Sequence, residues 1–376
     1  MKYFLYLAIA ALLTISANER PGYNWDVLTY VASAKSLDNL LPDQIHAYIY
    51  DYVKNEASDE VAEKLLNPAI EYRVAMQADS GLFAQQLPFY KPRVLYIYGI
   101  NGLQKLGVNP FRASHLISVM AVFTALLIFA ALLFGELKIG ISGVLFPLLL
   151  LPLGLYMVAI HSTPDGLVLL FFAAVALMYC ASRTGWLLLL LPVGILIRTD
   201  LILLVACMTA VAVFGDRLNA KGYLLSAATA VAAYLLLNTY YNSYGWSATF
   251  YVSFVERVFN PAEAPMDVTL AMYLKVLARS SFVALKTASF MAYVVSCGLI
   301  LHYQLRDGFL VVNIAAQRLL VLHHTCAVYV IVHFLLFPAV WERFFIGPYG
   351  ITVALGIYLV TRLPEDRKAI AAAGSP

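Results

Sequence analysis

Charged residues are scarce in this sequence. Asp, Glu, Lys and Arg together make up 12% of the 376 residues, about half of their usual share in a soluble domain. The formal net charge of +3 is too small to indicate a polyanionic partner, so we expect no nucleic-acid ligand. Hydrophobic residues account for 62% of the chain, which is more than one soluble core can bury. This composition excludes soluble enzymes and disordered regulators.

Motifs of several common chemistries are also missing. The sequence has no Walker motif, no HExxH and no GxSxG. No cysteine belongs to a CxxC pair, and all of them lie in apolar segments, where we expect small buried side chains: Cys180, Cys207, Cys297 and Cys326. His323 and His324 are adjacent, so on a helix they face different directions. We therefore expect no metal site and no cofactor.

The main feature of the sequence is its long apolar runs. Several exceed the ~18 residues that indicate a membrane span. They predict an all-α polytopic membrane protein, a single domain over residues 1–376 with about ten transmembrane helices. The expected spans are 3–15, 113–137, 141–160, 166–181, two short helices within 186–214, 223–240, 280–303, 319–337 and 350–361. The first run has the length of a signal peptide, but we expect it to be retained because Ile15 is a poor residue for cleavage.

A long polar loop, residues 18–112, interrupts this pattern. Four segments in it predict helices, at 25–40, 42–54, 59–66 and 92–106. The last has an irregular apolar face and could lie along the membrane surface as an amphipathic helix. The chain thus divides into the loop 18–112, a helical bundle over 113–361 and a tail over 362–376.

The distribution of cations predicts the orientation in the membrane. With ten spans, one face carries most of the Lys and Arg in termini and short loops: Lys2, Lys138, Arg183, Arg217, Lys221, Arg306, Arg318, Arg362, Arg367 and Lys368. The short loops of the other face hold only Arg198 and Arg343. Cation-rich loops stay in the cytoplasm, so we expect the long loop and the functional site on the extracytoplasmic face.

Three carboxylates on that face are candidates for function. Asp26 follows the first apolar run and could accept a proton from an incoming hydroxyl, or it could only cap the next helix. Asp165 likewise stands at a helix start and could complement the helix dipole. Asp200 pairs in sequence with Arg198 in the middle of a 29-residue apolar run (186–214). Charges placed there cost at least ~2.5–3.5 kcal/mol each in hydrocarbon, so they line a polar cavity or form a structural ion pair.

Cations near the same face could bind a phosphate. Arg343 stands between aromatic residues and could grip a phosphate with two hydrogen bonds, while Lys91 and Arg93 add two charges in the long loop. A third group consists of Lys275, Arg279 and Lys286. On a helix these side chains would fall within about 40° of one another and form a cationic stripe. The stripe could bind a lipid phosphate, or its side chains could only reach ordinary headgroups.

The arrangement resembles the GT-C superfamily of integral membrane glycosyltransferases, and in particular the bacterial polyprenyl-phosphate mannosyl- and arabinosyltransferases. The residues that carry the resemblance are Asn24-Trp25-Asp26 with Tyr30 and Ala34, the segment Gln86-Leu87-Pro88-Phe89-Tyr90-Lys91-Pro92-Arg93-Val94-Leu95-Tyr96, Ser162-Thr163-Pro164-Asp165-Gly166, Arg198-Thr199-Asp200 and Glu342-Arg343-Phe344. The resemblance implies that Asp26 is the catalytic base.

It also implies a reaction. A sugar would pass from a polyprenyl-phosphate-linked donor to a hydroxyl of a glycan, lipid or protein acceptor, with inversion and without a metal. The cations named above would stabilise the phosphate as it leaves, and the enzyme would lie in the inner membrane of a bacterium, with its site outside. Two other functions stay open: a transporter or flippase for lipid-linked glycans, and a non-catalytic membrane subunit of a glycan-assembly complex.

Overall fold

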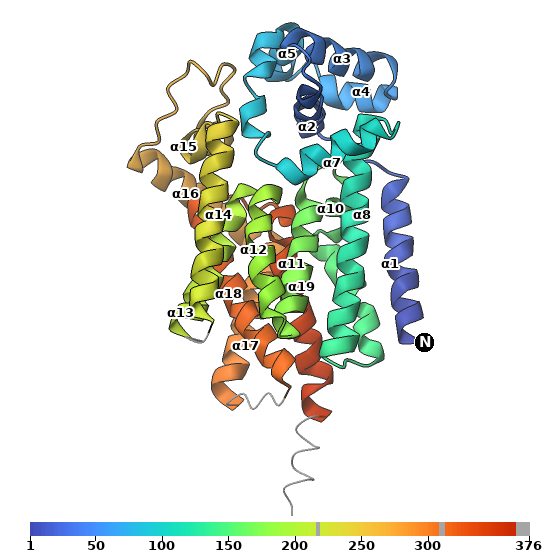
Figure 1. Cartoon of the computed structure of the whole chain (residues 1–376), viewed down its shortest axis with the longest axis vertical. Coiled ribbons are helices and arrows are strands. Elements are labelled where there is room, and N and C mark those ends of the chain that lie inside the picture. The colour runs from blue at the N-terminus through green and yellow to red at the C-terminus, as the bar shows by residue number, and fades with distance from the viewer. Residues whose placement is uncertain (216–218, 308–312, 366–376) are drawn as a thin grey trace, which may run out of the picture.

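The structure is a computed structural model that describes residues 1–215, 219–307 and 313–365. It forms an elongated bundle of helices with a layer of shorter helices across one end (Figure 1). Helices dominate the described residues, and their strand-like pairing is limited to one isolated bridge between Gly22 and His161. The prediction of an all-α protein is confirmed.

Five helices of the described chain are long and apolar enough to cross a membrane, as in an integral membrane protein. They are α8 (Pro110–Ala130, continued by a π-helical turn, Ala131–Glu136), α14 (Ala220–Tyr240), α17 (Ala288–Asp307), α18 (Ile314–Leu336) and α19 (Glu342–Thr361). Shorter apolar helices complete the bundle, among them α1 (Lys2–Asn18), α11 (Asp165–Cys180), α12 (Thr184–Ile197) and α13 (Ile202–Phe214). The total of ten spans stays a prediction.

Two predicted spans are broken in the structure, so the prediction of single helices there was wrong. Segment 141–160 divides into 3-10 turns at Ile141–Leu145 and Leu151–Leu153 and short helices α9 (Phe146–Leu150) and α10 (Leu155–Ile160). Pro147 and Pro152 have no backbone N–H to donate, and Gly154 has a φ of 102° that disfavours other residues. Segment 280–303 divides at Thr287, between α16 (Leu270–Lys286) and α17.

The other spans agree with the prediction to within a few residues, except that the last helix begins earlier than 350, at Glu342. The break expected inside 186–214 is present, because α12 ends before Arg198 and a 3-10 turn (Thr199–Leu201) leads into α13. Of the expected tail, residues 366–376 lie outside the described chain, as does Arg217, one of the cations used to assign the orientation.

The long loop folds into the layer that caps the bundle (Figure 1). It contains α2 (Asp26–Lys35), α3 (Pro42–Asn55), α4 (Asp59–Leu66), α5 (Glu71–Ala78), α6 (Ser80–Ala84) and α7 (Val94–Lys105), with 3-10 turns at Ser36–Asp38 and Leu87–Phe89. The sequence predicted four of these helices and missed α5 and α6. The layer has its own apolar core, formed by residues such as Val27, Ile49 and Phe83, so it is a folded cap and not a flexible loop.

A short backbone contact ties this cap to the bundle. The Gly22 amide donates to the Ile160 carbonyl (2.8 Å), and Gly22 forms the bridge with His161. The bridge is parallel, so the two chain segments continue side by side. Asp26 lies four residues after Gly22, and Asp165 lies four residues after His161. Two carboxylates separated by 139 residues are therefore brought to the same place.

Candidate functional site

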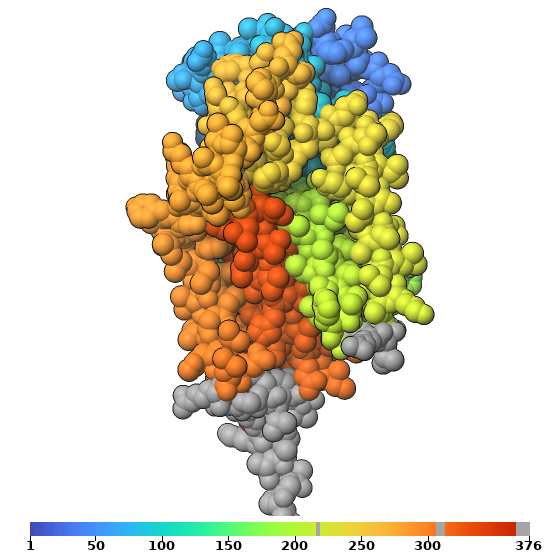
Figure 2. Space-filling view, turned by 90° about the vertical axis from the view of Figure 1, so that its left-hand side faces the viewer, coloured from blue at the N-terminus to red at the C-terminus, as the bar shows by residue number. Residues whose placement is uncertain are grey.

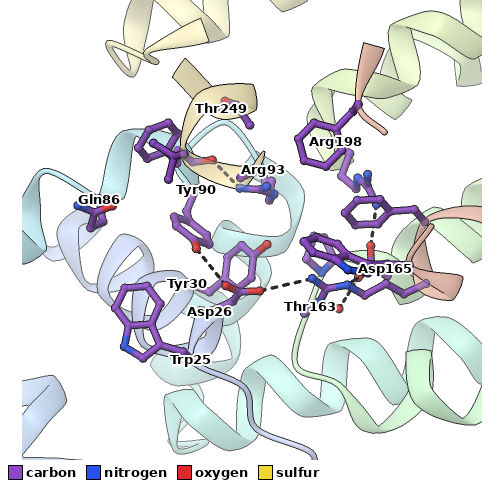
Figure 3. Close-up of a pocket in the computed structure, with 18 of the residues that line it drawn as sticks. Trp25, Asp26, Tyr30, Gln86, Tyr90, Arg93, Thr163, Asp165, Arg198 and Thr249 are labelled. Carbon is purple, nitrogen blue, oxygen red and sulfur yellow. Dashed lines mark hydrogen bonds and ion pairs between the residues drawn. The ribbon is translucent and has the colours of Figure 1, made fainter. Parts of the chain in front are cut away.

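A cavity of about 430 Å³ lies where the cap meets the bundle (Figure 3). Its walls come from the cap (α2, α5 and the segment before α7), from the turn before α11, from the segment after α15 (Gly245–Phe250) and from the start of α19. The charged residues among them are Asp26, Asp165, Arg73, Arg93, Arg198, Arg257 and Arg343. Five arginines against two aspartates give the cavity a positive character that suits an anionic ligand.

Asp26 faces this cavity from the first turn of α2. Its Oδ1 accepts a hydrogen bond from the Tyr90 hydroxyl (3.0 Å) and its Oδ2 a longer one from the Asn24 amide (3.3 Å). Trp25 occupies the N-cap position without a side-chain cap, so the interpretation of Asp26 as an N-cap was wrong. The carboxylate is 29% exposed, which leaves it accessible to a ligand in the cavity.

Asp165 is held much more tightly. One carboxylate oxygen accepts from Arg198 and the other from the Thr163 hydroxyl, both at 2.7 Å. Its side chain is only 4% exposed. The next residue, Gly166, lets α11 approach α8 closely, because a Cβ there would lie 2.7 Å from the Ser118 carbonyl oxygen. The close approach and the buried bonds fix Asp165 in one position.

Arg198 joins Asp165 to a second carboxylate. Its Nε and Nη2 donate to the two oxygens of Asp200 (3.0 and 2.7 Å), and Asp200 also contacts the His333 ring nitrogen Nε2 at 2.9 Å. The guanidinium carbon lies 4.3 Å from the centre of the Phe344 ring. Arg198 thus gives one hydrogen bond from each of its three nitrogens to the two aspartates, so this residue organises the site.

Arg343 lies between the two aspartates and is held less tightly. Its guanidinium is 3.7 Å from an oxygen of Asp26 and 3.7 Å from an oxygen of Asp165, beyond the range of a strong hydrogen bond. The rings of Trp341 and Phe344 flank it at 5.1 and 5.5 Å. An arginine oriented by aromatic rings and without a short bond to either carboxylate can still donate two hydrogen bonds to a ligand.

A second cavity of about 380 Å³ adjoins the first and reaches toward the bundle. The two share a wall that includes Arg93, Arg198 and Phe344. The second cavity is mostly apolar, with residues from α13, α14, α15 and α18 such as Leu203, Tyr234, Trp246 and Leu336. A polar chamber under the cap therefore opens beside an apolar one between helices of the bundle.

The structure brings together most of the residues that the sequence selected. Asp26, Arg93, Asp165, Arg198 and Arg343 line the first cavity, and Asp200 lines the second. Lys91 lines neither cavity, although its neighbour Arg93 does. Burial lowers the pKa of the Lys91 ammonium.

The predicted cationic stripe is separate from the site. Lys275, Arg279 and Lys286 lie on the exposed side of α16 and line neither cavity. The light-orange segment that contains α16 projects from the side of the molecule in Figure 2. The sequence placed these cations at the outer end of a span, but the break at Thr287 makes α16 a separate helix, which turns the stripe away from the cavities.

Several residues of the site were missed as candidates. Arg73 and Arg257 line the first cavity, and His333 binds Asp200. Tyr90 stood in the quoted motif without a role, and it donates to Asp26. Its burial, together with the charge of Asp26, raises its pKa well above the ordinary value, so it stays protonated and remains a donor. A single His or Arg without a partner nearby in the sequence carries no signal of this kind.

The comparisons with known proteins add nothing to this geometry. No family model, curated protein or solved structure matches the chain. Function must therefore be argued from the site alone. In the described part of the chain, no group of three or more His, Cys, Asp or Glu side chains could hold a metal ion, and the absence of a metal requirement stays a prediction.

Proposed function

We propose that the protein is a membrane glycosyltransferase of the GT-C type, which moves a sugar from a polyprenyl-phosphate-linked donor to an acceptor hydroxyl. The observation that carries the proposal is the position of Asp26. It is an accessible carboxylate in a cavity whose other charged groups are mainly arginines. A base and an anion-binding group, Arg343, lie within 3.7 Å of each other.

These groups can perform a single displacement. Asp26 accepts the proton of the acceptor hydroxyl, and the oxygen of that hydroxyl forms a bond to the anomeric carbon. The bond from that carbon to the phosphate oxygen breaks, and its electron pair stays on the phosphate. Arg343 and Arg93 lie where they can stabilise this charge. Attack from the face opposite the leaving group inverts the anomeric centre.

The adjoining cavity supports a lipid-linked donor. Its apolar walls come from helices of the bundle, and it meets the polar cavity at Arg93 and Arg198. A polyprenyl chain could lie between α13, α14 and α18 while its phosphate reaches the arginines. A water-soluble nucleotide sugar would have no use for this apolar chamber.

We place the site on the extracytoplasmic face of a bacterial inner membrane. The cap and the first cavity lie at the same end of the molecule, and the cation distribution in the sequence assigns that end to the outside. Ala78 is exposed at the end of α5 in the cap. A cysteine at this position is expected to react with a membrane-impermeant thiol reagent in intact cells. Labelling only after lysis would reverse the orientation.

The decisive experiment is transfer by the Asp26→Asn variant. Purified protein in lipid nanodiscs is supplied with a polyprenyl-phosphate-linked sugar and a glycan acceptor with free hydroxyls, and released polyprenyl phosphate is measured. Asn keeps the volume of Asp but cannot accept the proton, so turnover is expected to fall by on the order of 10²–10⁴ while donor binding persists. Asp51→Asn, on the exposed side of α3, is the matched control and is expected to keep wild-type turnover.

The same measurement separates the alternatives. A flippase or a non-catalytic subunit needs no base, so it would tolerate Asn at position 26 and release no polyprenyl phosphate at any rate. A larger loss in Asp165→Asn or Asp200→Asn than in Asp26→Asn would move the role of base to that residue.

A further inference from the structure

Two arginines of the first cavity take no part in the mechanism above. Arg73 comes from α5 and Arg257 from the segment after α15, and both line the cavity. The Arg257 guanidinium lies 4.8 Å from the centre of the Tyr72 ring, and Trp25 packs edge-on against Tyr72 at 5.2 Å. Arg257 therefore stands against an aromatic wall formed by Trp25 and Tyr72.

The two arginines lack a counterion. Neither forms an ion pair with a carboxylate within the described chain; Arg73 donates to the Lys64 carbonyl. Burial and the charge of Arg257 lower the pKa of Arg73, and Asp26 opposes this effect. Both arginines line the same cavity without a paired carboxylate, and this arrangement favours the binding of an anion there.

This pair is distinct from the cations assigned to the donor phosphate. Arg343 lies 3.7 Å from both Asp26 and Asp165, and Arg93 donates to the Phe89 carbonyl. Arg73 and Arg257 instead contact Lys64 and Tyr72. Asp26 approaches Arg343 at 3.7 Å, and Trp25, the residue before it, packs against Tyr72, on whose ring Arg257 lies. Asp26 therefore shares one cavity with both sets of cations.

We propose that Arg73 and Arg257 bind an anionic group of the acceptor, a phosphate or a carboxylate, while its hydroxyl faces Asp26. This assignment rests on the proposed function, because it places the acceptor opposite the donor. Two arginines can hold either anion through paired hydrogen bonds, and the half-buried Trp25 ring lines the same cavity, where a sugar can stack against it. The acceptor is accordingly an acidic glycan or a phosphorylated one, and not a neutral sugar.

Binding of small anions tests the assignment without turnover. Wild-type protein in nanodiscs is saturated with undecaprenyl phosphate, then titrated with inorganic pyrophosphate, glucuronate or glucose, and its unfolding temperature is recorded. A ligand that binds only the folded protein raises this temperature. We expect pyrophosphate or glucuronate to stabilise the loaded protein and glucose to have no effect. The anion that raises the unfolding temperature more identifies phosphate or carboxylate as the preferred group.

Variants show where the anion binds. Arg73→Gln and Arg257→Gln are expected to weaken the anion's apparent affinity at least tenfold and to leave undecaprenyl phosphate binding within twofold. Arg257 is exposed, so its variant is expected to fold even if Arg73→Gln does not, and Arg73→Lys is expected to restore part of the affinity. Lys54→Gln, an exposed cation of α3, is the control.

Two results would overturn the proposal. No anion-dependent stabilisation of loaded wild-type protein would mean that the cavity has no second anion site. Loss of undecaprenyl phosphate binding in Arg73→Gln or Arg257→Gln would assign the pair to the donor. If undecaprenyl phosphate does not bind even to wild-type protein, the proposed function fails, and the anion titration of unloaded protein still tests the arginine pair.

Discussion

Two aspartates lie within reach of the same arginine, Arg343, yet their environments differ. Asp165 has both oxygens bound at 2.7 Å and is almost completely buried. Asp26 accepts hydrogen bonds of 3.0 and 3.3 Å and is 29% exposed. Short buried bonds occupy the oxygens of a carboxylate and remove it from chemistry, whereas longer bonds in an open cavity leave lone pairs for a substrate. The comparison separates an aspartate that holds the site together from one that can react.

The largest effect on this difference between the two aspartates is expected when Arg198, the cation bound to Asp165, is removed. Arg198→Gln leaves two carboxylates, Asp165 and Asp200, without their buried partner. Breaking a buried ion pair from one side costs about 3–5 kcal/mol, so we expect a large fall in the unfolding temperature of the detergent-solubilised protein. Arg20→Gln, an exposed arginine after α1, provides the baseline. A stable Arg198→Gln would show that the network is dispensable for folding.

The next largest effect is expected at Arg343, which lies between the two aspartates, and it concerns activity. Arg343→Ala removes at least one charged hydrogen bond, worth about 1.5–3 kcal/mol, so we expect the catalytic efficiency toward a lipid-linked donor to fall by a factor of at least roughly 10–150. Arg343→Lys should recover only part of it, since an ammonium cannot donate in a bidentate manner. Steady-state kinetics with both variants measure this. Unchanged efficiency in Arg343→Ala would exclude the residue from the site.

The smallest effect is expected at the cations outside the cavities. Lys275→Gln, Arg279→Gln and Lys286→Gln, combined in one protein, change charges on the exposed side of α16. Because none of the three lines either cavity, turnover is expected to stay within about twofold, as solvated surface charges contribute little. A tenfold loss of turnover in the same assay would show that the cations of α16 contribute to the donor site.

The sequence predicted the parts of this molecule that depend on local pattern. The break inside 186–214 follows from the cost of placing Arg198 and Asp200 in hydrocarbon, and the helices of the cap follow from their periodicity. Asp26, Asp165 and Arg343 could be selected because each is a charge that precedes or follows an apolar run, and Arg198 because it lies inside one. The cost of an isolated charge in the membrane can be estimated from the sequence alone, because it depends on the apolar residues on either side.

Contacts between distant segments could not be predicted in this way. The bridge between Gly22 and His161 pairs two short turns without a strand pattern, and it is this contact that brings Asp26 next to Asp165. Arg73, Arg257 and His333 carry no local signal, because only the tertiary fold brings them to the cavities. The turn at Thr287 also escaped prediction, since hydrophobicity continues through it, and with it the orientation of α16 was missed.

The helices that meet at Arg198 have a further consequence for the surrounding membrane. α12 has 14 residues and α13 has 13, so each rises about 20 Å, whereas the hydrocarbon core of a bilayer is about 30 Å thick. A hairpin of this height matches only a locally compressed bilayer. We therefore expect the leaflet nearer the cap to dip beside α12 and α13, which would lower lipid headgroups to the level of Arg198. A lipid could then bring its phosphate to the cavity by lateral diffusion within the bilayer, without its tail leaving the membrane.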